Sequence, residues 1–493
     1  MSAGATCPCE DPVVIDTDPG QGVTSAAAKL PNRERSAMNR HRQILRNLLA
    51  CLLTLSATAV NAGGHTRAEP ETKAPQQILI RDVRVWDGTS DKAMPALNVL
   101  VEGNLIKTIG ADASAGDDVT VIDAGGRTLI PGIIDAHTHL ALPMNPTEIY
   151  REDPSYVTAL SVKAAQGVLL RGWTTVRDIG GPSQGLARAI NEGLVDGPRI
   201  YTSAMIISQT SGHGDLRALT DPHPNLGGPV NPNSQRYELL ADGPAEVRRA
   251  VRESLRQGAV QIKVMAGGGI SSQYDPIDTT QYSVEELRAA VESAADWNTY
   301  VAVHAYTDAA VNRALDAGVK VIEHGHLLTE PTLKRLKAEN AYLSSQSFGF
   351  VRIYAAQAQA SSARSRKSAL VMSGVDNLMT TAKKLGIPVA FGTDSFGSLR
   401  AYEAAVKEFG YRLRWFDSLE ILKQATSYNA ELLALTGPRN PYPDGPLGVI
   451  QPGAYADLLI VNGDPLTDVR VLEDYENNIR LIMKNGKIYK NSL

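Results

Sequence analysis

The sequence predicts an α/β protein: a (β/α)8 TIM barrel with a small β-sandwich built from both ends of the mature chain. The middle of the 493-residue chain alternates short apolar strands with helical stretches, which is typical of repeated βα units. Short strands of alternating polarity, separated by Gly and Asp turns, precede and follow that region. We therefore expect the β-sandwich over residues 77–128 and 436–493 and the barrel over residues 129–435.

The first 62 residues have the features of a targeting region. Basic residues follow Met38, an apolar run extends from Leu48 to Val60, and small residues end at Ala62. This pattern predicts a signal peptide over residues 38–62 and an exported protein, periplasmic or secreted. Residues 1–37 are expected to be a non-native or disordered extension, with translation starting at Met38, and residues 63–76 a polar linker.

Composition excludes several classes of protein. The net charge of −4 gives no reason to expect a nucleic acid or an anionic membrane as partner. Apolar runs after the signal segment are too short for a transmembrane helix. All three cysteines (Cys7, Cys9 and Cys51) precede residue 63, so the mature part has neither disulfides nor thiolate ligands. Any metal ion must be held by nitrogen and oxygen.

The strands can be assigned in chain order. At the two ends, ILIRDVRVWDG, LNVLVEGNLIKTIG, VTVIDAGG, GVIQPGAYADLLIVNGDP and NIRLIMKNGKIY predict the sandwich strands. Eight apolar runs predict the barrel strands: 133–139, 172–178, 199–205, 260–266, 300–306, 319–326, 341–346 and 387–394. Two long connections, residues 208–242 and 348–373, are expected to build a pocket and a lid as loops.

Six polar residues stand at the carboxyl ends of five predicted strands: His137, His139, Lys263, His304, His324 and Asp394. His137 and His139 are two residues apart on a strand, so their side chains point the same way. A barrel brings the carboxyl ends of its strands to one mouth. Imidazoles with a carboxylate suit Zn²⁺ or a similar divalent ion.

The roles of two residues at these strand ends, Lys263 and Tyr306, are ambiguous. Burial of Lys263 in an apolar strand disfavours its charge, unless the amine reaches solvent or a carboxylate. Tyr306 is two residues after His304 and faces the same way, which makes it a candidate oxyanion donor. It could equally pack inside the barrel.

These motifs together resemble the amidohydrolase superfamily of metal-dependent hydrolases: PGIIDAHTH, the fourth-strand lysine, His304, His324, the GTD ending at Asp394, and PGAYADLLIV. The resemblance implies that CO₂ converts Lys263 to a carbamate bridging two divalent ions, with zinc as the expected metal. His137, His139 and Asp394 would hold one ion, and His304 and His324 the other. Two ions make hydroxide available from a bridging water near neutral pH. Asp394 would serve as general base and then general acid.

Three shorter motifs, HAYT, IKVMAGGGISS and SGHGD, resemble the Xaa-Pro dipeptidase and carboxypeptidase-like branch, which also contains ochratoxinase. The resemblance implies hydrolysis of dipeptides or N-acyl amino acids, with ochratoxin A as a possible substrate, by a homo-oligomer. His213 and Tyr274 are the candidate substrate-binding residues. Arg177 and Arg217 are weaker candidates for binding a substrate carboxylate.

Two alternatives remain. One is a cyclic-amide or imidazolonepropionase-like hydrolase of the same superfamily. The other is a catalytically inactive oligomeric scaffold, which would be expected to have lost some of the six polar residues.

Overall fold

The computed structural model describes residues 76–114, 116, 119–351 and 362–493, which belong to one unit by their internal contacts. The predicted extension (1–37), the signal peptide (38–62), the three cysteines and linker residues 63–75 lie outside the described residues. In the described part of the chain, no helix is both long enough and apolar enough to span a membrane.

Parallel strands form the centre of the fold, and each of the eight predicted runs contains one. A three-stranded sheet has the order β6-β7-β8 (Ile133–Thr138, Trp173–Asp178 and Arg199–Thr202). A seven-stranded sheet has the order β10-β9-β11-β12-β13-β14-β15 (Glu238–Leu240, Ile206–Ser208, Ile262–Met265, Val301–Ala305, Val321–His324, Tyr342–Ser344 and Val389–Ala390). These strands are almost wholly buried, as expected of parallel strands covered by helices.

Backbone hydrogen bonds join the two sheets at both junctions. On the β8 side, Val260 N donates to Thr202 O at 2.9 Å. On the β6 side, Ala136 N donates to Phe391 O at 2.9 Å, and Asp394 N donates to His137 O at 2.7 Å. The segment after β15 therefore lies directly beside β6.

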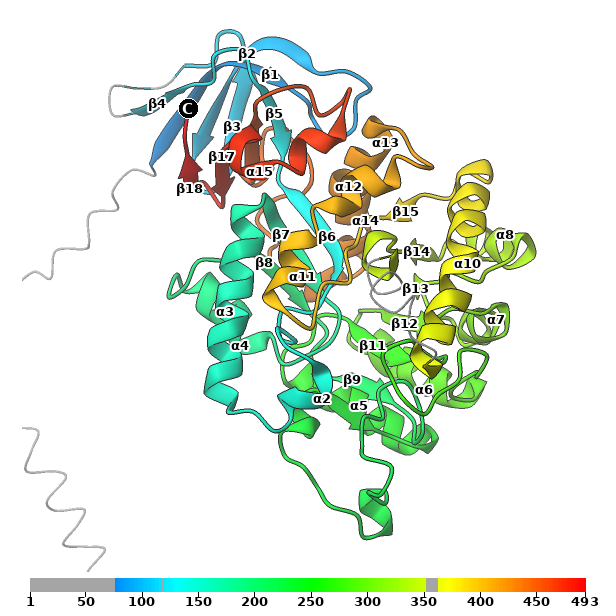
Figure 1. Cartoon of the computed structure of the whole chain (residues 1–493). Coiled ribbons are helices and arrows are strands. Elements are labelled where there is room, and N and C mark those ends of the chain that lie inside the picture. The colour runs from blue at the N-terminus through cyan, green and yellow to red at the C-terminus, as the bar shows by residue number, and fades with distance from the viewer. Residues whose placement is uncertain (1–75, 115, 117–118, 352–361) are drawn as a thin grey trace, which may run out of the picture. The chain divides into compact units, whose positions relative to one another are not determined.

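Helices connect the parallel strands, as the βα pattern predicts (Figure 1). They are α3, α4, α5, α6, α7, α8 and α10 (Pro154–Leu170, Gln184–Asn191, Gly243–Arg256, Val284–Ala295, Asp308–Asp316, Glu330–Ala338 and Ala363–Lys384). Shorter helices are α2, α11, α12, α13, α14 and α15 (Pro146–Ile149, Leu399–Ala404, Lys407–Arg412, Ser418–Lys423, Asn429–Ala434 and Tyr475–Asn478). Helix α6 begins at a capping box in which Ser283 and Glu286 each bond the other's backbone N–H.

Both predicted long loops contain regular structure. The segment 348–373 was expected to be a loop, which is wrong for its second half because helix α10 begins at Ala363. Ser362 caps that helix through its side chain, and Val371, Val375 and Leu378 follow with helical spacing on its buried face. In the segment 208–242, strand β10 pairs in parallel with β9.

Strands from the two ends of the chain form one hydrogen-bonded sheet, in the order β18-β17-β16-β5-β1-β2-β3 with β4 beside β1 (Figure 1). Their bounds are β1 Gln77–Val85, β2 Met94–Glu102, β3 Leu105–Gly110, β4 Val119–Asp123, β5 Thr128–Pro131, β16 Leu458–Val461, β17 Ile479–Lys484 and β18 Lys487–Asn491. The ends meet where β5 pairs antiparallel with β16, Ile130 opposite Leu459. Side chains from both halves pack into one apolar cluster.

Gly132 separates β5 from β6, and no larger residue fits there. A Cβ at this position would lie 2.1 Å from Thr174 Oγ1. The glycine lets the chain pass from the end sheet into the first parallel strand beside β7.

Candidate active site

The six predicted metal-ligating residues all line one cavity of about 170 Å³ at the carboxyl ends of the parallel strands. They lie in or directly after strands β6, β11, β12, β13 and β15: His137, His139, Lys263, His304, His324 and Asp394. All six are buried or nearly so. Strand order accounts for this convergence, because parallel strands end on the same side.

His137, His324 and Asp394 offer ligand atoms that all lie within 4.8 Å of one another. Asp394 Oδ1 lies 3.4 Å from His137 Nε2 and 3.4 Å from His139 Nε2. The rings of His304 and His324 are 4.7 Å apart between centroids. This set of nitrogen and oxygen donors fits a divalent ion such as Zn²⁺, and the two predicted ligand groups adjoin.

Hydrogen bonds orient the two histidines of the first strand. His137 Nδ1 donates to Glu323 Oε2 at 2.7 Å, and His139 Nδ1 donates to the Gly180 carbonyl at 3.0 Å. The Nε2 atom of each ring faces Asp394. Such bonding to the second nitrogen is usual for histidines that bind metals.

The other two histidines are oriented in opposite senses. His324 Nδ1 donates to Gln346 Oε1 at 2.7 Å, which leaves its Nε2 as the basic nitrogen. His304 Nε2 donates to the Gly268 carbonyl at 3.2 Å, which leaves Nδ1 as the basic nitrogen of that ring. Burial, followed by neighbouring histidines, holds the pKa of both rings well below the ordinary value, so both are neutral.

Behind His137 lies a fully buried ion pair. Arg177 Nη2 donates to Glu323 Oε1 at 2.6 Å, while its Nε donates to the Ala136 carbonyl at 2.5 Å. Burial would raise the pKa of Glu323, but Arg177 and His137 lower it well below the usual range. The expectation that Arg177 binds a substrate carboxylate is wrong, because Glu323 and the backbone already occupy this inaccessible guanidinium.

Neighbouring side chains shift the pKa values of Asp394 and Lys263. Burial would raise the pKa of Asp394, but His137, together with hydrogen bonds from His137 and His139, holds it well below its ordinary value. Burial lowers the pKa of Lys263 to about 8 against the opposing effect of Glu323 and Asp394. The site thus contains an ionised carboxylate, the neutral imidazoles of His304 and His324, and a buried amine.

Two of the ligating positions have left-handed backbone conformations. The φ angle is 71° at His324 and 50° at Asp394, values that non-glycine residues rarely adopt. Such strain is common at functional sites, where surrounding contacts hold the backbone in place. Here Asp394 N and Thr393 N both donate to the His137 carbonyl.

Tyr306 lies in the cavity wall, as expected from its spacing. Its ring is 4.8 Å from that of His304 and 5.5 Å from that of His324. Burial, aided by Asp394, raises the pKa of Tyr306 well above its ordinary value. The hydroxyl therefore keeps its proton and can donate a hydrogen bond within the cavity.

His213 comes from the long segment after β9 and stacks on His304, with ring centroids 4.1 Å apart. Its Nδ1 contacts Asp275 Oδ2 at 3.1 Å and Ser272 Oγ at 2.7 Å. A Cβ on Gly269 would lie 1.9 Å from the His213 ring, so this glycine makes room for it. Asp275 also accepts from Gly269 N at 2.7 Å, which ties the loop after β11 to this histidine.

Tyr274, a predicted substrate-binding residue, does not line this cavity and is 36% exposed. The loop after β11 instead presents Ile270 and Ser271 to the cavity. Arg217 is held by Asp215 at 2.6 Å and lines a neighbouring cavity.

Several residues of this site belong to none of the predicted motifs. Glu323 and Gln346 orient histidines from the buried side, and Arg364 at the start of α10 lines the cavity. Glu323 precedes His324 in the sixth predicted strand, which is the one signal that could have indicated it.

The chain is similar in sequence to proteins of a known family. A family model described as "Amidohydrolase family" matches residues 128–489. Ochratoxinase from Aspergillus niger is 32% identical over 387 residues, covering 73% of this chain and 75% of that protein.

Solved structures of similar fold include an amidohydrolase at 33% identity and a TM-score of 0.78, covering 85% of this chain and 100% of that one. A prolidase complexed with N-methylphosphonate-L-proline has 32% identity and a TM-score of 0.77, covering 84% of this chain and 100% of that one. A Xaa-Pro dipeptidase with bound methionine has 27% identity and a TM-score of 0.72, covering 84% and 100%.

Proposed function

Because the chain belongs to the amidohydrolase family and is a hydrolase acting on amide bonds, we propose that it is a two-metal enzyme that releases an amino acid from dipeptides or N-acyl amino acids. One observation carries this proposal: six potential ligands from five strands line a single cavity together with Tyr306 and His213. Its similarity to an ochratoxinase and to a prolidase supports a substrate of this kind.

His137, His139 and Asp394 would hold one ion, His304 and His324 the other, and Lys263 would bridge them as a carbamate. The carbamate would form when the neutral Lys263 amine adds to CO₂ and loses one proton. Counted from the protonated lysine, two protons are lost and a buried cation becomes an anion. When bound, the ions supply an acidified water and polarise the amide carbonyl.

The remaining chemistry falls to side chains of the chain itself. Asp394 accepts the proton of the attacking water and passes it to the leaving nitrogen. Tyr306 donates to the carbonyl oxygen as negative charge develops there. His213, fixed by Asp275, faces the amino-acid part of the substrate.

We also infer that the parallel strands close into a (β/α)8 barrel, with the end strands as a β-sandwich beside it. The hydrogen bonds at both junctions of the parallel sheets support closure, because each links neighbouring strands. The single apolar cluster shared by both halves of the end sheet supports the sandwich.

The test is hydrolysis by purified protein reconstituted with Zn²⁺, using N-acetyl-L-phenylalanine, Xaa-Pro dipeptides and ochratoxin A. We expect release of the free amino acid, loss of activity after chelation, recovery with metal, and two ions per chain by elemental analysis. Activity that survives complete metal removal would contradict the proposal.

A second candidate is hydrolysis of a cyclic amide. A dihydroorotase from Mycobacterium tuberculosis is 28% identical over 228 residues, covering 46% of this chain and 41% of that protein. Ring opening of dihydroorotate or a hydantoin, with no release of amino acids from N-acyl substrates, would favour this function.

A further inference from the structure

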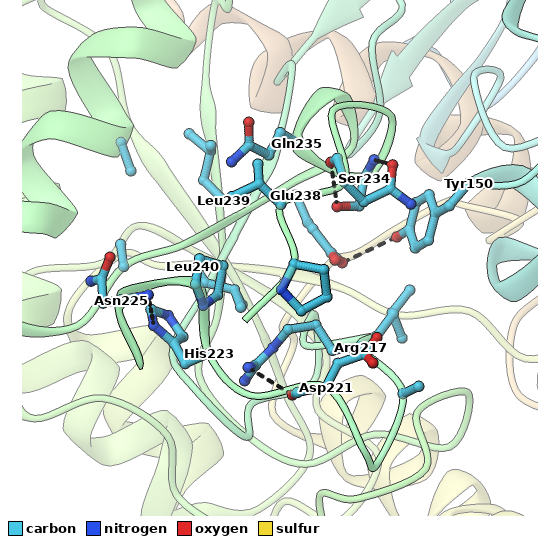
Figure 2. Close-up of a pocket in the computed structure, with 18 of the residues that line it drawn as sticks. Tyr150, Arg217, Asp221, His223, Asn225, Ser234, Gln235, Glu238, Leu239 and Leu240 are labelled. Atoms are coloured by element: carbon cyan, nitrogen blue, oxygen red, sulfur yellow. Dashed lines mark hydrogen bonds between the residues drawn. The ribbon is translucent and has the colours of Figure 1, made fainter. Parts of the chain in front are cut away.

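A second cavity, which we call the outer chamber, adjoins the active-site cavity and is larger, at about 550 Å³ (Figure 2). The two cavities share four wall residues: Thr147, Tyr150, Leu216 and Glu238. The other walls come from the segment after β9, strand β10 and helix α5.

Size indicates that the two cavities act together. The inner cavity of about 170 Å³ is smaller than the roughly 300–1,000 Å³ typical of small-molecule sites, whereas the pair together falls in that range. The inner cavity contains the candidate ligands, so the reacting amide must lie there. A substrate longer than the inner cavity has the outer chamber directly beside it.

Glu238 is the acidic residue of the wall that the two cavities share. It is 6% exposed, and the Tyr150 hydroxyl donates to its Oε2 at 3.1 Å (Figure 2). Burial raises the pKa of Glu238 to about 8, so this carboxyl is mostly uncharged at neutral pH. An uncharged carboxyl is a poor partner for the free ammonium group of a dipeptide.

Charged side chains also line the chamber, among them Arg151, Arg217, Asp221, Glu246 and Arg249. Arg217 forms an ion pair with Asp215 at 2.6 Å. His223 Nδ1 accepts from Asn225 N at 3.1 Å, while its buried Nε2 has no hydrogen-bond partner among the described residues.

We propose that the outer chamber binds the acyl part of the substrate, and that it takes an acyl chain longer than a single amino acid. This inference rests on the proposed function and deepens it. The enzyme would act on blocked peptides and extended N-acyl amino acids in preference to free dipeptides.

The experiment compares two substrates with the same leaving residue, N-acetyl-L-phenylalanine and N-benzyloxycarbonyl-glycyl-L-phenylalanine, using reconstituted holoenzyme. Gln235 is an exposed residue of the outer chamber that does not line the inner cavity. Gln235→Trp should lower the ratio of kcat/KM for the long substrate to that for the short one at least about fivefold, mainly through KM. Ala218→Trp, at another position of the same segment, repeats the test if the first variant fails to fold.

The matched control is Gln451→Trp, which changes an exposed glutamine that lines neither cavity and should keep the wild-type ratio. An unchanged ratio in both chamber variants would overturn the subsite and leave the proposed function intact. A wild-type preference for glycyl-L-phenylalanine over the blocked peptide, lost in Glu238→Gln, would also overturn it. Failure of the wild type to hydrolyse any of these amides would overturn the proposed function, and the subsite with it.

Discussion

The orientation of two candidate ligands, His137 and His324, depends on buried side chains that belong to no predicted motif. His137 is fixed by Glu323, which is in turn held by Arg177, and His324 is fixed by Gln346. Such partners determine which ring nitrogen is available to a metal ion. Predictions for single residues therefore concern both the ligands and the residues behind them.

Lys263→Ala should lose the two-metal site and reduce kcat/KM by more than about 100-fold, because the bridging anion is removed. Short carboxylic acids that mimic the carbamate should restore part of the activity. Metal content per chain and activity, with and without added acid, check this. Lys484→Ala removes another lysine whose pKa burial lowers to about 8, at a site in the end sheet, and should keep both metals. Full activity in Lys263→Ala would refute the two-metal arrangement.

Glu323→Gln should weaken metal binding by about 10–100-fold, because the His137 ring loses its anionic partner. Competition with a chromophoric chelator measures the dissociation constant directly. Glu408→Gln is the matched control, since Glu408 also pairs with a buried arginine, Arg412, at 2.8 Å. It should cost stability without changing metal affinity. Equal metal affinities in the two variants would mean that Glu323 only supports the fold.

At the scale of elements, the segments that follow the parallel strands build one wall of this site. The loop after β11 contacts His213, which comes from the segment after β9. Helix α10 contributes Lys367, whose Nζ donates to the Gly269 and Ser272 carbonyls at 2.9 and 3.1 Å. Three elements thus hold one wall of the cavity in place.

Gly269→Ala tests this arrangement, because the added methyl group must displace the His213 ring. We expect KM to rise about fivefold or more while metal content stays the same. Gly185→Ala is the control, since a Cβ at Gly185 would meet nothing within 4 Å. If steady-state kinetics give an unchanged KM for Gly269→Ala, His213 does not contact substrate.

For the whole molecule, the end sheet and the parallel strands depend on each other through a buried contact. Arg199 of β8 donates from Nε to Asp457 Oδ2 at 2.9 Å and from Nη2 to Asn485 Oδ1 at 2.7 Å. Its guanidinium also lies 3.7 Å from the centroid of the Tyr455 ring.

Arg199→Met should lower the free energy of unfolding by about 3 kcal/mol, since it leaves a buried carboxylate without its partner. Urea denaturation of the metal-loaded protein measures this. Arg188→Met breaks an exposed pair with Glu192 and should change stability by less than about 1 kcal/mol. Similar losses of unfolding free energy in both variants would show that the buried contact stabilises the protein no more than an exposed ion pair.

Stability should also depend on pH through Glu238. Burial raises its pKa from the ordinary value of 4.5 to about 8 in the folded protein. Between these values the folded state holds a proton that the unfolded state has released, so this residue makes stability fall as pH rises from about 5 to 8. Glu238→Gln keeps the shape and removes the titration, so its stability relative to wild type should increase over that range. Parallel curves from urea unfolding at pH 5.5 and 8 would contradict this.

Much of the fold could be predicted because parallel strands have a strong local signature. Each of the eight predicted runs contains a strand, and the family expected from PGIIDAHTH and its partners is confirmed. Helix α10 was missed because its apolar residues are diluted by Ser, Arg and Lys, and only contact with the core shows which face is buried. Tyr274 was misplaced because the loop after β11 turns according to contacts with His213 and Lys367, which are distant in sequence.

By itself, the sequence determined which residues can ligate a metal and that the strands bringing them together are parallel. Both follow from side-chain chemistry and from periodicity, which are local properties. Only the tertiary structure decided which nitrogen of each histidine is free, that Arg177 supports Glu323, and that the outer chamber adjoins the site. Those features depend on contacts between residues up to 186 positions apart, as between His137 and Glu323, and such contacts exist only once the chain has folded.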